Sequence, residues 1–242
     1  MVKMLDGIGK IVEGYNSVLS AIQNNRAIEI NILEKKIESN KIKKLIIVAK
    51  QKKVDIKIIK DKSNWKFNKT EYVASICKPK KIYNESSIKD FKNRNFIVCD
   101  HIQDTNNLGA IARSAASFEF NVMCVPERRS ARISERTFKI SSGGLENIEI
   151  IQYKSIFTLI KKIKLINIWT VGLDMNAETS IENFDLGIQN IAFFIGSEEK
   201  GLSTEIMNKL DHILKIPMSN NMESLNVSVA AGIAMQYIFV KK

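Results

Sequence analysis

The chain has 242 residues, 45% of them hydrophobic, with 37 Lys and Arg against 26 Asp and Glu and a formal net charge of +11 at pH 7. This length and apolar content allow one large domain or two small ones. No apolar run approaches the roughly 20 residues of a bilayer-spanning helix, and the first residues, which include Asp6 and Glu13, lack the core of a signal peptide. We therefore expect a soluble cytoplasmic protein.

The cysteines and histidines argue against metal and hydrolase chemistry. Cys77, Cys99 and Cys124 are odd in number, form no CxxC pair and lie in or near apolar runs. We therefore expect three reduced thiols, without disulfides or a zinc site. His101 and His212 are the two histidines and no GxSxG motif occurs, so imidazole metal sites and Ser-His-Asp hydrolysis have few possible members. We expect no bound metal.

The excess of positive over negative charge lies in the N-terminal third. Residues 1–82 contain 19 Lys and Arg against 8 Asp and Glu, whereas residues 83–242 contain 18 of each. A compositional bias of the genome toward lysine would act on both parts of the chain. The asymmetry therefore favours an N-terminal domain that binds a polyanion. The polar, aperiodic residues 83–94 separate two apolar-patterned regions, as a linker does. We predict a basic domain in residues 1–82, a linker in 83–94 and a second domain in 95–242.

The N-terminal third has the pattern of a small α/β domain. Residues 13–24 place apolar side chains at helical spacing, and the short runs 45–48 and 56–59 predict strands. From residue 41 to residue 69, eleven lysines stand against two acids, with Trp65 and Phe67 between them. This composition suits phosphate contact and base stacking. The alternative is that the two aromatic residues are core and the lysines a solvated face.

The remainder has the pattern of a parallel α/β domain. Continuous apolar runs are typical of strands buried in a parallel sheet, and they occur at residues 96–99, 121–125, 148–151, 168–171, 191–195 and 213–216. Helical patterns lie between them, for example at 155–165 and 203–210. We predict a five- or six-stranded sheet.

The last 32 residues contain a strand, a polar loop and a helix. An apolar run ends at Pro217, and after Ser224 the period changes. Apolar and small residues then recur at helical spacing: Val227, Ala230, Ala231, Ala234 and Ile238. Ser224 and Asn226 would lie at the mouth of this helix, where N–H groups are unpaired and the dipole is positive. This placement favours a binding site, although Ser224 could also be only a helix cap.

A second polar segment begins at Asn107, in the sequence NLGAIARSA. Asn106 or Asn107 stands where a helix N-cap is expected, and Gly109 allows close approach of backbone or substrate. Arg113 follows on the same helix, and its planar fork suits a phosphate or carboxylate. The alternative is a surface arginine paired with Glu119 or another acid.

A third segment, FFIGSEEKGL, places Glu198 between Gly196 and Gly201 at a strand end. The glycines allow a sharp turn and close approach of a ligand. A carboxylate at such a place either caps the next helix or orients a partner, and Arg113 and Asn226 are candidates.

Taken in order, NLGxxxRSA, IGxExxGL and IPM…SLNVSVA resemble the three motifs of the SpoU-type 2′-O-ribose RNA methyltransferases of the SPOUT superfamily. The resemblance implies an α/β SPOUT domain with a parallel sheet and a deep C-terminal trefoil knot. It also implies a small ribosomal-protein-like domain that binds RNA, and a homodimer.

The resemblance also assigns residues. It implies S-adenosylmethionine as the cofactor, held in a bent form by Gly196, Gly201, Ile216 and Leu225. The positions that match the family's catalytic and positioning residues are Asn107, Arg113, Glu198, Ser224 and Asn226. Arg113 matches the group assigned to activate the ribose hydroxyl. A guanidinium with a pKa above about 12 is a poor base, so stabilisation of the developing alkoxide is the easier account.

The predicted function is methyl transfer from S-adenosylmethionine to the ribose 2′-oxygen of a guanosine in 23S rRNA. Residues 126–133, with Arg128 and Arg129, resemble a loop of the large-subunit rRNA guanosine enzymes. A tRNA ribose 2′-O-methyltransferase with the same core is the alternative. An RNA-binding protein without activity is a further one, but it would be expected to have lost Arg113, Glu198 or Asn226, and the chain has all three.

Overall fold

The structure is a computed structural model that describes residues 7–185, 190–219, 221 and 224–241. The chain forms two compact units. The N-terminal unit contains the residues up to Lys81 together with 133–147, and the C-terminal unit contains 82–132 and 148–242. Residues 133–147, which we expected in the second domain, are therefore folded with the first.

The N-terminal unit is built on a four-stranded sheet in the order β1-β4-β2-β3. Its strands are β1 Ile11–Glu13, β2 Ala27–Leu33, β3 Asp55–Ile59 and β4 Val73–Cys77. The β2–β3 pair is parallel and the other two pairs are antiparallel. Its helices are α1 Tyr15–Gln23, α2 Asn40–Gln51, α4 Glu135–Ile140 and α5 Gly144–Asn147, with short 3₁₀ turns η1 Glu34–Lys36 and η2 Lys62–Asn64. The predicted helix 13–24 and strand 56–59 correspond to α1 and β3.

The predicted strand 45–48 is wrong, because these residues lie in the middle of α2. Ser39 caps this helix by accepting a hydrogen bond from the Ile42 backbone N–H. Ile42, Leu45 and Ala49 are buried at helical spacing, whereas Ile47 is 56% exposed. A four-residue apolar run does not distinguish a strand from one face of a helix.

Trp65 belongs to the core of this unit. It is 7% exposed, packs with Leu33 and Ala74, and meets the Phe67 ring edge-on with the ring centres 5.0 Å apart. Its indole N–H donates to the Asn68 carbonyl oxygen over 2.9 Å. Base stacking on Trp65 is therefore excluded. All eleven lysines between residues 41 and 69 are exposed.

The C-terminal unit contains a parallel sheet in the order β10-β12-β9-β11-β6-β7-β8-β5. The strands are β5 Tyr83–Asn84, β6 Phe96–Cys99, β7 Val122–Pro126, β8 Glu149–Tyr153, β9 Trp169–Leu173, β10 Thr179–Ser180, β11 Ile191–Ile195 and β12 His212–Lys215. The six predicted strands are all present. Two short edge strands, β5 and β10, raise the total to eight.

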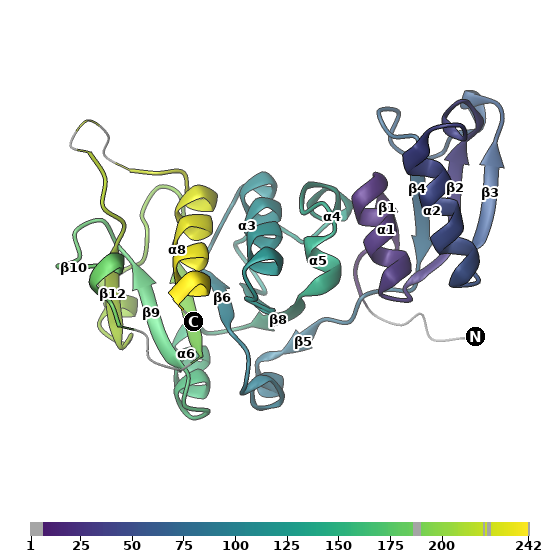
Figure 1. The fold of residues 1–242 in the computed structure, drawn as a ribbon. Helices are drawn as coiled ribbons and strands as arrows, with labels where there is room; N and C mark the ends of the chain where they lie inside the picture. Colours follow the sequence, from purple (N-terminus) through teal and green to yellow (C-terminus); the bar gives the residue numbers. More distant parts are fainter. Residues whose placement is uncertain (1–6, 186–189, 220, 222–223, 242) are drawn as a thin grey trace. The chain divides into compact units, whose positions relative to one another are not determined.

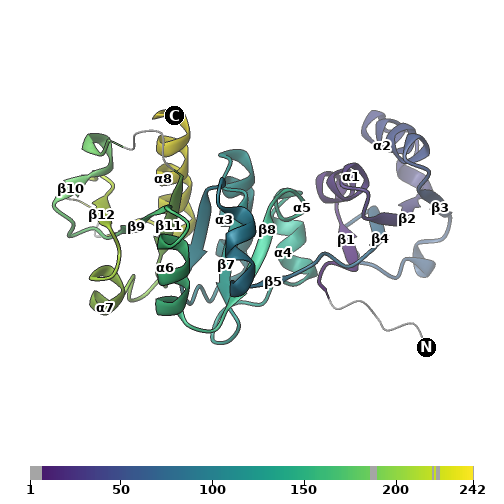
Figure 2. The same cartoon turned by 90° about the horizontal axis from the view of Figure 1, so that it is seen from below.

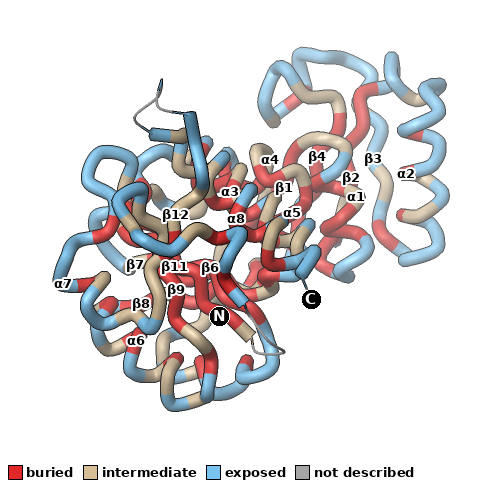
Figure 3. Tube along the Cα trace, turned by 60° about the vertical axis from the view of Figure 1, so that its left-hand side comes forward, coloured by how far each residue is buried: buried red, intermediate tan, exposed pale blue. Residues whose placement is uncertain are grey.

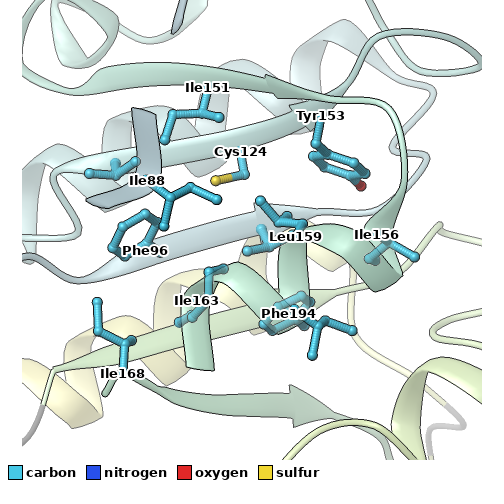
Figure 4. Close-up of a cluster of buried hydrophobic side chains, with 14 of the residues drawn as sticks. Ile88, Phe96, Cys124, Ile151, Tyr153, Ile156, Leu159, Ile163, Ile168 and Phe194 are labelled. Atoms are coloured by element: carbon cyan, nitrogen blue, oxygen red, sulfur yellow. The ribbon is translucent and has the colours of Figure 1, made fainter. Parts of the chain in front are cut away.

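Helices cover both faces of this sheet, as Figures 1 and 2 show. Its helices are α3 Thr105–Ser117, α6 Ile156–Lys164, α7 Thr204–Met207 and α8 Val227–Lys241, with 3₁₀ segments η3 Glu85–Phe91 and η4 Ile181–Asn183. Residues of η3, α6 and α7 pack on alternate strand residues such as Phe96 and Phe194 (Figure 4). Helices α3 and α8 pack against each other, outside this cluster. The strands β6, β9 and β11 are consequently buried along most of their length (Figure 3).

The predicted linker 83–94 is folded within the C-terminal unit. Tyr83 and Asn84 pair with β8, and the Asn84 side chain accepts the Ser86 backbone N–H over 2.9 Å. Ile88 and Phe91 of η3 are buried in the core. Two apolar residues three positions apart are enough to attach this segment, and they form too short a pattern to show periodicity.

Cys77, Cys99 and Cys124 are free and buried. Burial raises the pKa of the Cys99 and Cys124 thiols, so neither is a ready nucleophile. Among the described residues, no helix is long and apolar enough to cross a membrane.

Candidate functional site

Two motif segments meet at one edge of the parallel sheet. Strands β6 and β11 are parallel neighbours, so the turn of residues 100–104 after β6 and the loop of residues 196–203 after β11 lie at the same edge. Ligands of open parallel sheets bind at the carboxyl ends of the strands. This edge is therefore the candidate site.

Helix α3 begins about one turn earlier than it would if Asn107 were its N-cap. Its N-cap is Asp104, whose carboxylate accepts the Asn106 backbone N–H over 2.8 Å. The predicted caps, Asn106 and Asn107, are therefore inside the helix. Asn107 lies in the first turn and is 8% exposed, so its side chain is available for contacts within the protein.

Asn107 joins the three motif segments. Its side-chain N–H donates to the Glu198 carboxylate over 2.8 Å, and its side-chain oxygen accepts from the Asn226 amide over 3.1 Å. The Asn226 side-chain oxygen accepts the backbone N–H and the hydroxyl of Ser228, over 2.9 and 2.6 Å. Each amide is thereby held in one orientation, because its oxygen and its nitrogen have different partners.

Asn226 also fixes the start of α8. Its side-chain oxygen accepts the Ser228 N–H, and its carbonyl oxygen accepts the Ala230 N–H over 2.9 Å. Asn226 is thus the N-cap, and the alternative that Ser224 is the cap is wrong. Ser224 is exposed two residues earlier.

Glu198 is held as an anion. Its carboxylate accepts the Asn107 side chain at 2.8 Å and the Gln103 and Asp104 backbone N–H groups, both at 3.4 Å. Partial burial raises the pKa of Glu198, but the hydrogen bonds from Asn107 and from backbone N–H groups outweigh it, so the pKa lies below its ordinary value. Arg113 and Asn226 were the expected partners of Glu198, but its side-chain partner is Asn107, which in turn accepts a hydrogen bond from Asn226.

Arg113 does not join this cluster. It lies six residues after Asn107 in α3, which corresponds to about 9 Å along the helix axis and a different face. The residue is exposed, and among the described residues no ion pair to Glu198 or Glu119 is present. The Arg113 side chain is therefore accessible to solvent.

The loop after β11 turns where only glycine fits. A Cβ on Gly196 would lie 1.9 Å from the Gly201 carbonyl carbon and 2.3 Å from the Leu202 nitrogen. Gly201 donates its N–H to the Ser197 carbonyl oxygen over 2.9 Å and has φ +61°, with open space where a Cβ would stand. The turn is consequently closed on the Gly196 side and open on the Gly201 side.

Ile216 and Leu225 border the long loop between β12 and α8. Both are partly buried, so each leaves apolar surface accessible. Ile216 directly follows β12, which is joined through β9 to β11. The ends of β11 and β12 therefore supply backbone and apolar surface at the same edge as Glu198.

An open pocket of about 740 Å³ lies elsewhere on the sheet. It is lined by Lys164, Asn167, Ile168, Trp169, Asp211 and His212. Trp169 and His212 begin β9 and β12, so the pocket is at the amino ends of parallel strands, opposite the motif loops. Within the described parts of the chain, no cluster of His, Cys, Asp or Glu could hold a metal ion.

Two hydrogen bonds of the site could not be predicted from the sequence. The N–H groups of Gln103 and Asp104 face Glu198, and backbone groups carry no residue-type pattern. The cap at Asp104 was missed in favour of Asn106 and Asn107, although Asp and Asn cap helices about equally well.

Comparisons with known proteins agree on one family. The model of the SpoU rRNA Methylase family matches residues 94–236. A Staphylococcus aureus protein named for the TrmH family of tRNA/rRNA methyltransferases is 27% identical over 239 residues, which cover 96% of each chain. The Bacillus subtilis protein YacO, named for the same family, is 33% identical over 147 residues, covering 61% of this chain and 59% of YacO.

Among solved structures, the SpoU methyltransferase AviRb from Streptomyces viridochromogenes, in complex with AdoMet, has a TM-score of 0.77 at 18% identity. The match covers 96% of this chain and 89% of AviRb. At this identity the likeness concerns the fold. It extends over both units of the chain.

Proposed function

The chain belongs to the SpoU rRNA Methylase family, and from this premise we propose that it is a cytoplasmic enzyme that methylates the ribose 2′-oxygen of a guanosine in 23S rRNA. The observation that carries the proposal is the hydrogen-bonded series Glu198–Asn107–Asn226. It joins residues from all three family motifs at the carboxyl edge of a parallel sheet.

The residues of this edge fit S-adenosylmethionine as the cofactor. The exposed parts of Ile216 and Leu225 offer apolar contact to an adenine ring, and the open side of the turn at Gly201 leaves room for a ligand. When bound, S-adenosylmethionine supplies a methyl group already activated by its sulfonium. The protein then has to align a ribose oxygen and ease the loss of its proton.

The polar residues of the site have distinct proposed roles. Asn107 and Asn226 hold the α3 and α8 N-termini together and, with Ser224, border the place of the ribose. Glu198 fixes Asn107. Arg113 stabilises the negative charge that develops on the ribose oxygen, and its exposed position leaves it accessible to RNA.

We also propose a homodimer through α8. Apolar side chains on this helix are exposed, namely Val229, Ile233, Phe239 and Val240. A helix that is apolar on its outward side is typical of an interface.

The proposed trefoil knot has support from connectivity. Helix α8 follows β12, near one edge of the sheet, yet packs on α3, which follows β6 near its middle.

The N-terminal unit is proposed to recruit RNA. Its eleven exposed lysines between residues 41 and 69 would contact phosphates, and every motif residue lies in the C-terminal unit. The exposed Arg128 and Arg129 favour rRNA over tRNA by the loop resemblance.

The test supplies the full chain with unmodified 23S rRNA and tRNA transcripts and S-adenosylmethionine carrying a labelled methyl group. Label at one guanosine of 23S rRNA, in a linkage that resists alkaline hydrolysis, is the expected result, because a 2′-O-methyl group removes the hydroxyl that attacks the phosphate. Label in tRNA at a ribose 2′-oxygen would show that the substrate is tRNA and would leave the proposed reaction unchanged. No label in either RNA, with the protein folded, would overturn the proposal.

A further inference from the structure

The segment between β7 and α4 carries three arginines. We call residues 127–132 the arginine loop; Arg128, Arg129 and Arg132 in it are exposed. Arg129 has φ +58°, a conformation unfavourable by about 1–2 kcal/mol for a residue with a Cβ. Such a backbone persists only where its surroundings hold it.

The arginine loop is held at both ends. At its start, the Glu127 N–H donates to the Tyr153 carbonyl oxygen over 3.0 Å. Further along, the Ala131 N–H and the Ser130 hydroxyl both donate to the Ile102 carbonyl oxygen, over 2.7 and 3.0 Å. The loop is thus attached to the turn of residues 100–104, which leads into α3.

Gln103 contacts the arginine loop and the Glu198 carboxylate at once. Its side-chain amide donates to the Arg129 carbonyl oxygen over 2.9 Å, while its backbone N–H donates to Glu198. The side-chain bond has an ordinary length. The Gln103 and Asp104 N–H bonds to Glu198 are 3.4 Å long, beyond the usual range of about 2.7–3.2 Å.

Long hydrogen bonds of this kind tighten when a substrate assembles a catalytic site. A shift of a few tenths of an ångström in the turn is enough to bring these N–H groups into the usual range. The arginine loop is the element that can impose this shift, because it is bonded to Ile102 and Gln103 and presents arginines that bind phosphate bidentately.

We propose that Gln103 is a positioning residue, through which an RNA phosphate bound by the arginine loop tightens the backbone hydrogen bonds to Glu198 and so fixes Asn107 for methyl transfer. This inference rests on the proposed function. It makes the rate of the chemical step depend on contact of the loop with RNA, which a purely electrostatic role of the arginines would not.

Gln103→Met tests the coupling, because methionine keeps the side-chain length and the backbone N–H but cannot donate to Arg129. Single-turnover rates are measured on the full chain at saturating RNA and S-adenosylmethionine, alongside the affinities for both. We expect the rate to fall about tenfold, equivalent to about 1.4 kcal/mol, with both affinities within about twofold of the original. Gln23→Met, at the exposed end of α1, is the matched control and should change nothing.

The second variant neutralises the loop as Arg128→Gln with Arg129→Gln. In the original background it should lower both RNA affinity and the saturated rate. In the Gln103→Met background it should lower RNA affinity alone, because the connection to Glu198 is already broken. Rate losses that multiply, or an unchanged rate for Gln103→Met in an active protein, would overturn the inference. An original protein with no transfer to any RNA would instead overturn the proposed function, and this inference with it.

Discussion

The side chain of Asn107 donates a hydrogen bond of 2.8 Å to Glu198, across 91 residues of sequence. This bond fixes which end of the Asn107 amide faces Glu198, and hence which end faces Asn226. Neither residue is interesting alone: an asparagine in the first turn of a helix and a glutamate in a glycine turn are common. Together with the hydrogen bond from Asn226 to Asn107, their contact joins three separate segments into one site.

Asn107→Asp should reduce methyl transfer by about 10- to 100-fold without unfolding the protein. The aspartate has the same shape but places a carboxylate where Glu198 now accepts a hydrogen bond. Hydrogen bonds to charged groups contribute about 1.5–3 kcal/mol, which corresponds to that range of rates. Single-turnover assays and circular dichroism would check this. Wild-type rates in the variant would show that Asn107 has no part in positioning.

Glu198 should stabilise the fold in a pH-dependent way. Its native pKa is lowered, so its contribution is complete above the unfolded value of about 4.3 and is lost as the pH falls through the lower native value. The melting temperature of Glu198→Gln should thus lie below that of the original protein at pH 7, and the difference should shrink below about pH 4. A gap that is constant with pH would contradict this.

The two glycines of the turn after β11 should differ sharply on substitution. Gly196→Ala forces a Cβ into the Gly201 and Leu202 backbone, so the turn must open, and we expect loss of S-adenosylmethionine binding and of several kcal/mol of stability. Gly201→Ala meets open space and suffers only the strain of φ +61°, about 1–2 kcal/mol. Calorimetry of both variants separates the two effects. Equal losses would mean that the turn tolerates no side chain on either side.

The sequence predicted the central strands of the C-terminal sheet well because β6, β7 and β11 are buried on both faces. Runs such as Ile191–Ile195 are apolar throughout, and the parallel arrangement follows from the helices between them. The same reasoning failed at residues 45–48, where a similarly apolar run forms one turn of α2. What decided that case was the burial of Ile42 and Ala49, which a four-residue window cannot contain.

The sequence motifs named the residues of the candidate site, but they did not show which of these residues contact one another. The motifs identified Glu198, Asn107 and Asn226, whereas composition could not show that Asn107 stands between the other two. Contacts made by backbone N–H groups, such as that of Gln103, leave no trace in residue type. The placement of residues 133–147 in the N-terminal unit was missed for a related reason, since it depends on long-range contacts, which include one buried ion pair.

That pair is Arg26 and Glu146, joined over 2.8 Å with the Glu146 side chain fully buried. Arg26→Met would leave an unpaired buried carboxylate and should destabilise the N-terminal unit by about 3–5 kcal/mol in urea unfolding. Arg26→Met combined with Glu146→Met should recover part of this loss. Lys43→Met, which breaks the exposed pair with Glu38, is the control and should change stability by less than about 1 kcal/mol. Similar effects at both sites would contradict the buried-pair account.

The same pair determines how RNA recruitment should be tested. Deleting residues 1–82 would remove Arg26 and expose the buried apolar side chains of residues 133–147, such as Phe138 and Leu145, so a loss of RNA binding would have two explanations. Substitution of exposed lysines avoids this. We expect that changing Lys43, Lys44 and Lys50 of α2 together to Gln weakens RNA binding and leaves S-adenosylmethionine binding near its original value.

The distinguishing measurement is the salt dependence of RNA affinity. Each phosphate contact that is lost should flatten the logarithmic slope by about 0.7–0.9, so the triple variant should lose up to about 2–3 units. The control changes Lys89, Lys92 and Lys161 to Gln, which are exposed in the C-terminal unit, and removes the same charge from a part of the chain without excess charge. If both triple variants flatten the slope equally, only net charge matters. An unchanged slope in the α2 variant would move RNA recruitment away from this helix.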